Sequence, residues 1–240
     1  MSATAAATGV VALLGLAAGV AVDRAAASFP WPAAGRRTRS RNTRVPAGAP
    51  AIPSRDRHVE ERPAARPALV LLTAALCALT AWRFGVSAEL PAYLLLAIVG
   101  VLLAAIDRRH SLLPNRVVLP TLVAGGVLLA GAAAVAGEWP ALLRAVLAAA
   151  AVFGVLLAMA LVSPRGMGMG DVKLGAVLGL YLGWLGWPHV VLGLFTGFAV
   201  QAVLALVLMA VRRVGLRTEL PFGPALLLGT GLVVLAPLVP

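Results

Sequence analysis

The distribution of apolar residues constrains this chain most. Eight apolar stretches follow one another along its 240 residues, and the segments between them carry most of the charged side chains. A helix that crosses a lipid bilayer needs about 20 mostly apolar residues, and most of these stretches approach that length. We therefore expect an all-α, polytopic membrane protein with about eight transmembrane helices. The stretches cover roughly residues 4–22, 67–82, 90–106, 117–136, 141–162, 172–184, 189–211 and 222–239.

The composition excludes several other classes of protein. Hydrophobic residues make up 61% of the chain and charged residues only 12%, which is too apolar for a soluble domain. The formal net charge is +11, yet the basic residues lie between membrane stretches, so we expect no nucleic-acid binding. The single cysteine, Cys77, excludes a disulfide framework and a cysteine-rich zinc site.

The basic residues also predict an orientation, because cytoplasmic loops retain lysine and arginine. With both termini external, four basic segments fall on the cytoplasmic side and only Arg83 and Arg144 lie outside. Residues 1–23 are interpreted as a first transmembrane helix, since no basic residue precedes that stretch as in a signal peptide. Residues 24–66 are rich in arginine, proline, alanine and glycine, so we expect a disordered cytoplasmic linker. Its arginines are expected to contact anionic lipid, with a partner or substrate as the alternative.

Two aspartates are the strongest candidates for chemistry. Asp107 ends the third stretch and Asp171 precedes the sixth, and the two complete spans between them return both to the same membrane face. Ionisable residues at membrane depth are costly, and two carboxylates in one site can share a proton and activate water. The pair therefore predicts aspartyl-protease chemistry. For Asp171 the alternative is a purely structural cap of the sixth helix.

Glycines cluster around the second aspartate. Three alternate glycines in residues 166–170 let the backbone approach a peptide substrate closely, or form a flexible turn. Gly175, Gly179 and Gly183 then recur every four residues, a spacing that permits close packing between helices. We interpret this second set as structural.

Three segments, taken in order, point to one family. They read AAIDRRHSLLPN at 104–115, GMGDVKL at 168–174 and ELPFGP at 219–224. Together they resemble the type IV prepilin peptidases, which are GxGD-type intramembrane aspartyl proteases. The resemblance implies that Asp107 and Asp171 are catalytic. It also implies residues that bind substrate or shape the site, namely Gly168, Gly170, Lys173, Pro114, Asn115, Glu219, Pro221 and Gly223.

Several of these residues have simpler alternative roles. Lys173 lies two residues beyond Asp171, so we expect it to point away and to reach lipid headgroups. Asn115 is expected to cap the fourth helix, and Pro114 to fix the turn before it. Glu219 is expected to pair with an arginine.

The resemblance implies an aspartic endopeptidase of the plasma membrane of a prokaryote. Residues 67–240 form its membrane catalytic domain, which cleaves short basic leaders from type IV prepilins or pseudopilins at the cytoplasmic face. Bifunctional members also methylate the new amino terminus with S-adenosylmethionine and carry two Cys-x-x-Cys pairs between their first two helices. No cysteine occupies that region here, so we expect neither methylation nor a zinc ion, and proteolysis needs no cofactor.

Two alternatives from other classes remain open. A cation- or proton-coupled transporter also uses paired aspartates, although it predicts inverted repeats and acids near mid-membrane. A catalytically inactive pilus-assembly protein would keep the fold and tolerate loss of either aspartate. Loss of activity on a single Asp→Asn change, with the protein still inserted in the membrane, separates the enzyme from the assembly protein.

Overall fold

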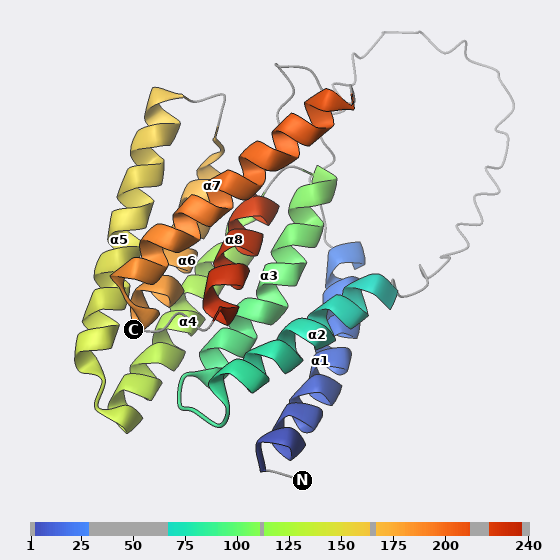
Figure 1. Ribbon diagram of the computed structural model, residues 1–240, viewed down its shortest axis with the longest axis vertical. Coiled ribbons are helices and arrows are strands. Elements are labelled where there is room, and N and C mark those ends of the chain that lie inside the picture. The colour runs from blue at the N-terminus through green and yellow to red at the C-terminus, as the bar shows by residue number, and fades with distance from the viewer. Residues whose placement is uncertain (1–2, 29–66, 111–112, 164–166, 212–220, 237–240) are drawn as a thin grey trace, which may run out of the picture.

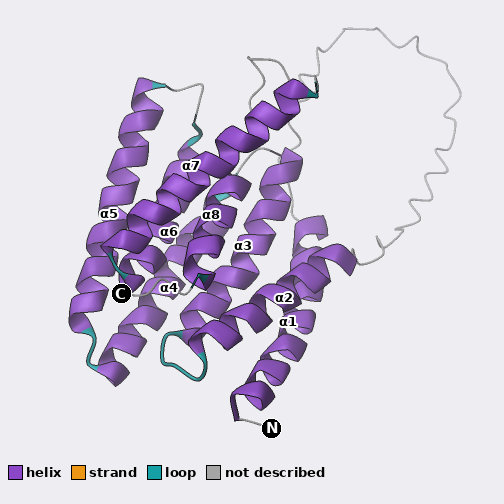
Figure 2. Ribbon diagram, viewed as in Figure 1, coloured by secondary structure: helices purple, strands orange, loops and turns teal. Residues whose placement is uncertain are grey.

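The structure is a computed structural model of the chain, and it describes residues 3–28, 67–110, 113–163, 167–211 and 221–236. Eight helices hold nearly all of these residues, and no strand occurs within them (Figure 2). The expected all-α fold is confirmed, and each apolar stretch of the sequence corresponds to one helix. The helices are α1 (Ala3–Ser28), α2 (Pro67–Phe84), α3 (Leu90–His110), α4 (Asn115–Ala136), α5 (Trp139–Val162), α6 (Met169–Leu185), α7 (Trp187–Ala210) and α8 (Gly223–Leu235).

Most of these helices suit a membrane. Six of the described helices, all except α6 and α8, are long and apolar enough to cross a bilayer. The helices α6 and α8 are shorter, with 17 and 13 residues. The helix α6 also differs in its surroundings, because other helices enclose it. The polytopic architecture expected from the sequence is thereby confirmed.

Successive helices run in alternating directions (Figure 1). The carboxyl ends of α3, α5 and α7 and the amino ends of α4, α6 and α8 therefore lie at one end of the bundle. We call it the aspartate end, because Asp107 and Asp171 lie there. Of the expected linker, residues 24–28 continue α1, and residues 29–66 lie outside the described part of the chain.

The helix α6 forms the centre of the bundle, where it packs against α4, α5, α7 and α8. Every residue from Leu174 to Trp184 is buried. A Cβ on Gly179 would lie 2.8 Å from the carbonyl oxygen of Ala148 and 3.0 Å from the Cα of Ala149, both in α5. The absence of side chains on this face thus lets the two backbones approach, as the glycine spacing predicted.

The opposite end of the bundle carries the tryptophans, and we call it the tryptophan end. Trp82, Trp139 and Trp187 are exposed there, whereas Trp184 is buried. Tryptophan is enriched where a membrane meets water, so these side chains mark one interface. At this end the guanidinium of Arg144 donates hydrogen bonds of 2.8 and 2.7 Å to the carbonyls of Gly183 and Trp184. These bonds satisfy carbonyl groups that the carboxyl end of α6 would leave without partners.

Candidate active site

Asp107 is buried at the aspartate end. It lies in the last turns of α3 and is only 4% exposed. Gly223, the first residue of α8, packs directly against it, because a Cβ there would lie 2.7 Å from Oδ2 of Asp107. That oxygen has no hydrogen-bond partner among the described residues. A buried carboxylate oxygen without a donor is costly, so this position favours occupation by water or by a substrate group.

Asp171 lies in the first turn of α6, where the helix itself holds it. The helix begins at Met169, and the N–H of Gly168 donates a 3.3 Å hydrogen bond to Oδ2 of Asp171. The carboxylate therefore caps the helix start, as the structural alternative stated. Capping does not exclude chemistry, because a carboxylate has two oxygens and the cap uses one of them.

The two aspartates share one electrostatic site. Burial, followed by the negative charge of Asp107, raises the pKa of Asp171 to about 6, and the Gly168 hydrogen bond opposes this shift. In the structure both aspartates lie at the same end of the bundle, as the sequence led us to expect. Two neighbouring carboxylates cannot both ionise easily, so the pair can hold one proton between them. One acid and one base beside each other is what hydrolysis by activated water requires.

Leu113 packs between two glycines of the site: Gly170, which precedes Asp171, and Gly223, which contacts Asp107. A Cβ on Gly170 would lie 2.8 Å from the Cβ of Leu113, and one on Gly223 would lie 3.4 Å from its Cδ1. Leu113 therefore contacts α6 and α8 at the points nearest Asp171 and Asp107. Sequence reasoning missed this residue, because a leucine in an apolar chain carries no signal of its own.

Lys173 and Asn115 contact each other. The Nζ of Lys173 donates a 2.8 Å hydrogen bond to Oδ1 of Asn115, which joins α6 to α4. Lys173 was expected to reach for lipid, and the structure instead gives it a partner in the protein. The expected cap by Asn115 is wrong, because Asn115 is the first helical residue and Pro114 occupies the cap position. Pro114 is extended there, with φ −72° and ψ 127°, as its expected role in the turn requires.

The remaining candidates lie at the beginning of α8 or beyond the described part. Pro221 is half-buried and lies two residues before Gly223. Between them, the ring of Phe222 packs against that of Phe198 in α7, with centroids 5.0 Å apart. Glu219 lies outside the described residues. Within the described ranges, no three His, Cys, Asp or Glu side chains come together as metal ligands would.

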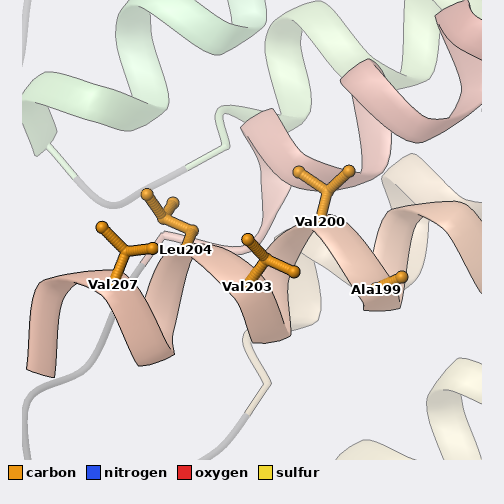
Figure 3. A pocket seen from close by; sticks show the side chains of 5 residues that line it. All are labelled: Ala199, Val200, Val203, Leu204 and Val207. Carbon is orange, nitrogen blue, oxygen red and sulfur yellow. The ribbon is translucent and has the colours of Figure 1, made fainter. Parts of the chain in front are cut away.

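A groove on α7 does not compete with the aspartate pair as a site of chemistry. It has a volume of about 430 Å³ and is lined only by apolar side chains (Figure 3). Such a surface suits lipid chains or another apolar segment, and it holds no group that could move a proton. The lining residues are Ala199, Val200, Val203, Leu204 and Val207.

Known proteins similar to this chain point the same way. Residues 94–211, which include both aspartates, match the type IV leader peptidase family. A prepilin leader peptidase/N-methyltransferase of Pseudomonas aeruginosa is 36% identical over 162 residues, covering 67% of this chain and 54% of that protein. The protein of the same name from Bacillus subtilis is 33% identical over 168 residues, covering 68% and 63%. The chain thus spans between about half and two thirds of these relatives' length. No solved structure is significantly similar to it.

Proposed function

Because the chain carries a type IV leader peptidase family domain, we propose that it is an aspartic endopeptidase that removes leader peptides from prepilins or pseudopilins. One observation carries the proposal: Asp107 and Asp171 come from helices far apart in the sequence and lie at the same end of the bundle, where Leu113 packs against both Gly170, next to Asp171, and Gly223, which contacts Asp107. The names of the Pseudomonas and Bacillus relatives support prepilins as the substrate class.

The proposed mechanism uses one water molecule between the two carboxylates. The ionised carboxylate takes a proton from the water as its oxygen attacks the scissile carbonyl carbon, and the protonated one donates its proton to the carbonyl oxygen. The tetrahedral intermediate then collapses, the C–N bond breaks, and the departing nitrogen takes up a proton from the pair. The Oδ2 of Asp107 supports this scheme, because it makes no direct hydrogen bond within the described residues, although the backbone N–H of Gly223 lies close enough to act on the same carboxylate.

We place this site at the cytoplasmic face of a prokaryotic plasma membrane. Arg108, Arg109, Arg116 and Lys173 all lie at the aspartate end, in or beside the helices that carry the pair. Positive residues near the ends of spans are retained on the cytoplasmic side. They also favour contact with the anionic lipid of that leaflet.

The proposal includes no cofactor. Proteolysis by two carboxylates and water requires none. The relatives' names include an N-methyltransferase, but residues 29–66, between the first two helices, contain no cysteine for a zinc site. We therefore propose that this chain leaves mature amino termini unmethylated and uses neither zinc nor S-adenosylmethionine.

The test is mass spectrometry of a tagged prepilin's amino terminus after co-expression with this chain. Asp107→Asn and Asp171→Asn are each expected to lower the cleavage rate by about 10²–10⁴-fold, because each removes one proton-transfer group. Glu138→Gln is the matched control, since it neutralises an exposed acid at the opposite end. All variants are checked for membrane insertion. Intact prepilins with the unaltered chain would favour an assembly protein or a transporter. Cleavage that survives either Asp→Asn change would show that the aspartate pair does not catalyse it.

A further inference from the structure

Leu113 lies between the two segments that carry the aspartates, although no motif marks it. On one side its backbone packs against the start of α6, because a Cβ on Gly170 would lie 3.4 Å from the nitrogen of Leu113 and 3.5 Å from its Cα. On the other side its Cδ1 faces Gly223, which in turn packs against Oδ2 of Asp107. Since Gly170 directly precedes Asp171, one leucine contacts both halves of the site.

The turn that holds Leu113 is constrained on the α4 side. A proline restricts the residue before it to extended conformations, so Pro114 limits the directions that Leu113 can take. The carbonyl of Pro114 accepts hydrogen bonds of 2.9 and 3.1 Å from the N–H groups of Val117 and Val118. Val118 is buried, and its packing anchors this first turn of α4 in the core.

On the α6 side, the hydrogen bond from Lys173 to Asn115 fastens the same turn. The Nζ and Oδ1 atoms are 2.8 Å apart. Asn115 lies two residues after Leu113, and Lys173 lies three residues after Gly170, so the bond ties the two segments together beside the point where they pack. Its donor is a charged ammonium, and such bonds are stronger than those between neutral groups. The proton transfers between water and the two carboxylates give this bond no chemical task.

We propose that Leu113 is a positioning residue that sets the separation of Asp107 and Asp171. The hydrogen bond between Lys173 and Asn115 holds Leu113 in place. This inference rests on the proposed function, since it assigns a role in the same reaction. The glycines on either side of the leucine offer no flexible side chain that could absorb a change, and close-packed contacts transmit displacement. The distance between the carboxylates decides whether they share one proton and one water, so the leucine acts on the chemical step.

The first experiment compares Leu113→Ala with Leu113→Met, a substitution that nearly keeps the volume. The rate of leader release from a tagged prepilin is measured per inserted protein. Leu113→Ala should lower kcat at least about tenfold and leave KM nearly unchanged, and Leu113→Met should restore most of the loss. Leu129→Ala is the matched control and should leave kcat unchanged, because it removes the same atoms from a buried position roughly 20 Å further along α4.

A second set of variants tests the hydrogen bond without opening a cavity. Asn115 is exposed, so Asn115→Ala removes the acceptor alone, and Lys173→Met removes the donor but keeps most of the apolar stem. Each should lower kcat several-fold, and the double variant should lose no more than either alone, because both changes remove one interaction. Arg116→Gln, which removes an exposed cation next to Asn115, is the control for loss of charge and should have no effect.

Infrared titration of Asp171 tests the positioning without any substrate. Burial, followed by the charge of Asp107, raises the pKa of Asp171 to about 6. Water that enters the space left in Leu113→Ala weakens the effect of burial, so this pKa should fall in that variant. It should return in Leu113→Met and stay unchanged in Leu129→Ala. If the unaltered chain cleaves no prepilin, the proposed function fails, and the titration still decides the positioning.

Three results would overturn the proposal. The first is Leu113→Ala behaving like Leu129→Ala in either measurement. The second is a rise in KM without a fall in kcat, which would make Leu113 or Lys173 a substrate contact. The third is additive losses in the double variant, which would show that Lys173 and Asn115 act separately. If Leu113→Ala does not insert into the membrane, Asn115→Ala decides, because its exposed side chain supports no packing.

Discussion

Gly223 is the residue at which the smallest change should most disturb the aspartate pair. Adding one methyl group, as Gly223→Ala, would bring a Cβ within 2.7 Å of Oδ2 of Asp107, so the carboxylate must move. Displacement of a catalytic group by about 1 Å can cost about a hundredfold in rate, and we expect a loss of that order in prepilin cleavage.

The control for this change lies in the same helix. A Cβ on Gly231 would meet nothing within 4 Å, so Gly231→Ala should leave cleavage unchanged. Both variants are measured by the rate at which leader peptide is released from a tagged prepilin in membranes. Full activity of Gly223→Ala would show that this glycine does not set the position of Asp107.

The electrostatic coupling of the pair gives a second prediction at this scale. The negative charge of Asp107 is one cause of the raised pKa of Asp171, so Asp107→Asn should lower that pKa below about 6. Burial is the larger cause and remains, so the pKa should stay above the usual range of an aspartate. Infrared titration of the carboxyl band, with Asp171 identified by Asp171→Asn, measures it. An unchanged or higher pKa in the variant would mean that the two carboxylates do not interact.

Single residues show which parts of the site the sequence could predict. Asp107 and Asp171 were identifiable because charge is rare in apolar segments and span parity places them on one side. The contact between Lys173 and Asn115 joins residues 58 apart, and no pattern along the chain encodes such a pair. Leu113 was unpredictable for a similar reason, because its importance comes only from the two glycines that it contacts.

At the scale of the helices, the contact between α5 and α6 should depend on Gly179. Alanine normally stabilises a helix by about 1 kcal/mol relative to glycine. At position 179, however, a Cβ would meet the backbone of α5, and overpacking of this kind costs about 1–3 kcal/mol. Gly179→Ala should therefore lower the melting temperature in detergent. Gly154→Ala in α5, where a Cβ would meet nothing, should raise it slightly, and the same sign for both variants would contradict this packing.

The helix boundaries show a limit of hydropathy. The apolar stretches located all eight helices, yet α3 continues to His110 and α6 begins at Met169, beyond the expected ends. An apolar stretch of the sequence ends at its first charged residue. The helical hydrogen bonding of the backbone, in contrast, continues through Arg108 and Arg109 at the end of α3 and includes the capped turn at Asp171 at the start of α6. The candidate site lies in these extensions, so the sequence located the site better than it located the ends of its helices.

For the whole molecule, the proposed orientation predicts which end meets each side of the membrane. The chain has one cysteine, Cys77, which is 1% exposed and should not react. In intact cells, a membrane-impermeant maleimide should label Glu138→Cys at the tryptophan end and leave Ser163→Cys at the aspartate end unlabelled until the cells are opened. The reverse pattern would place the aspartates outside and contradict a cytoplasmic active site.

The tryptophans place the fluorescent side chains of the molecule at one end of the bundle. Four of its five tryptophans lie at one end, and the fifth, Trp31, lies outside the described residues. With Trp31 replaced by phenylalanine, all tryptophan fluorescence would come from one leaflet. Brominated lipids placed in that leaflet alone would quench the emission, and the same lipids in the other leaflet would not. Any change of emission on adding a substrate would then report a movement transmitted along the helices, since none of the fluorophores lies beside the aspartates.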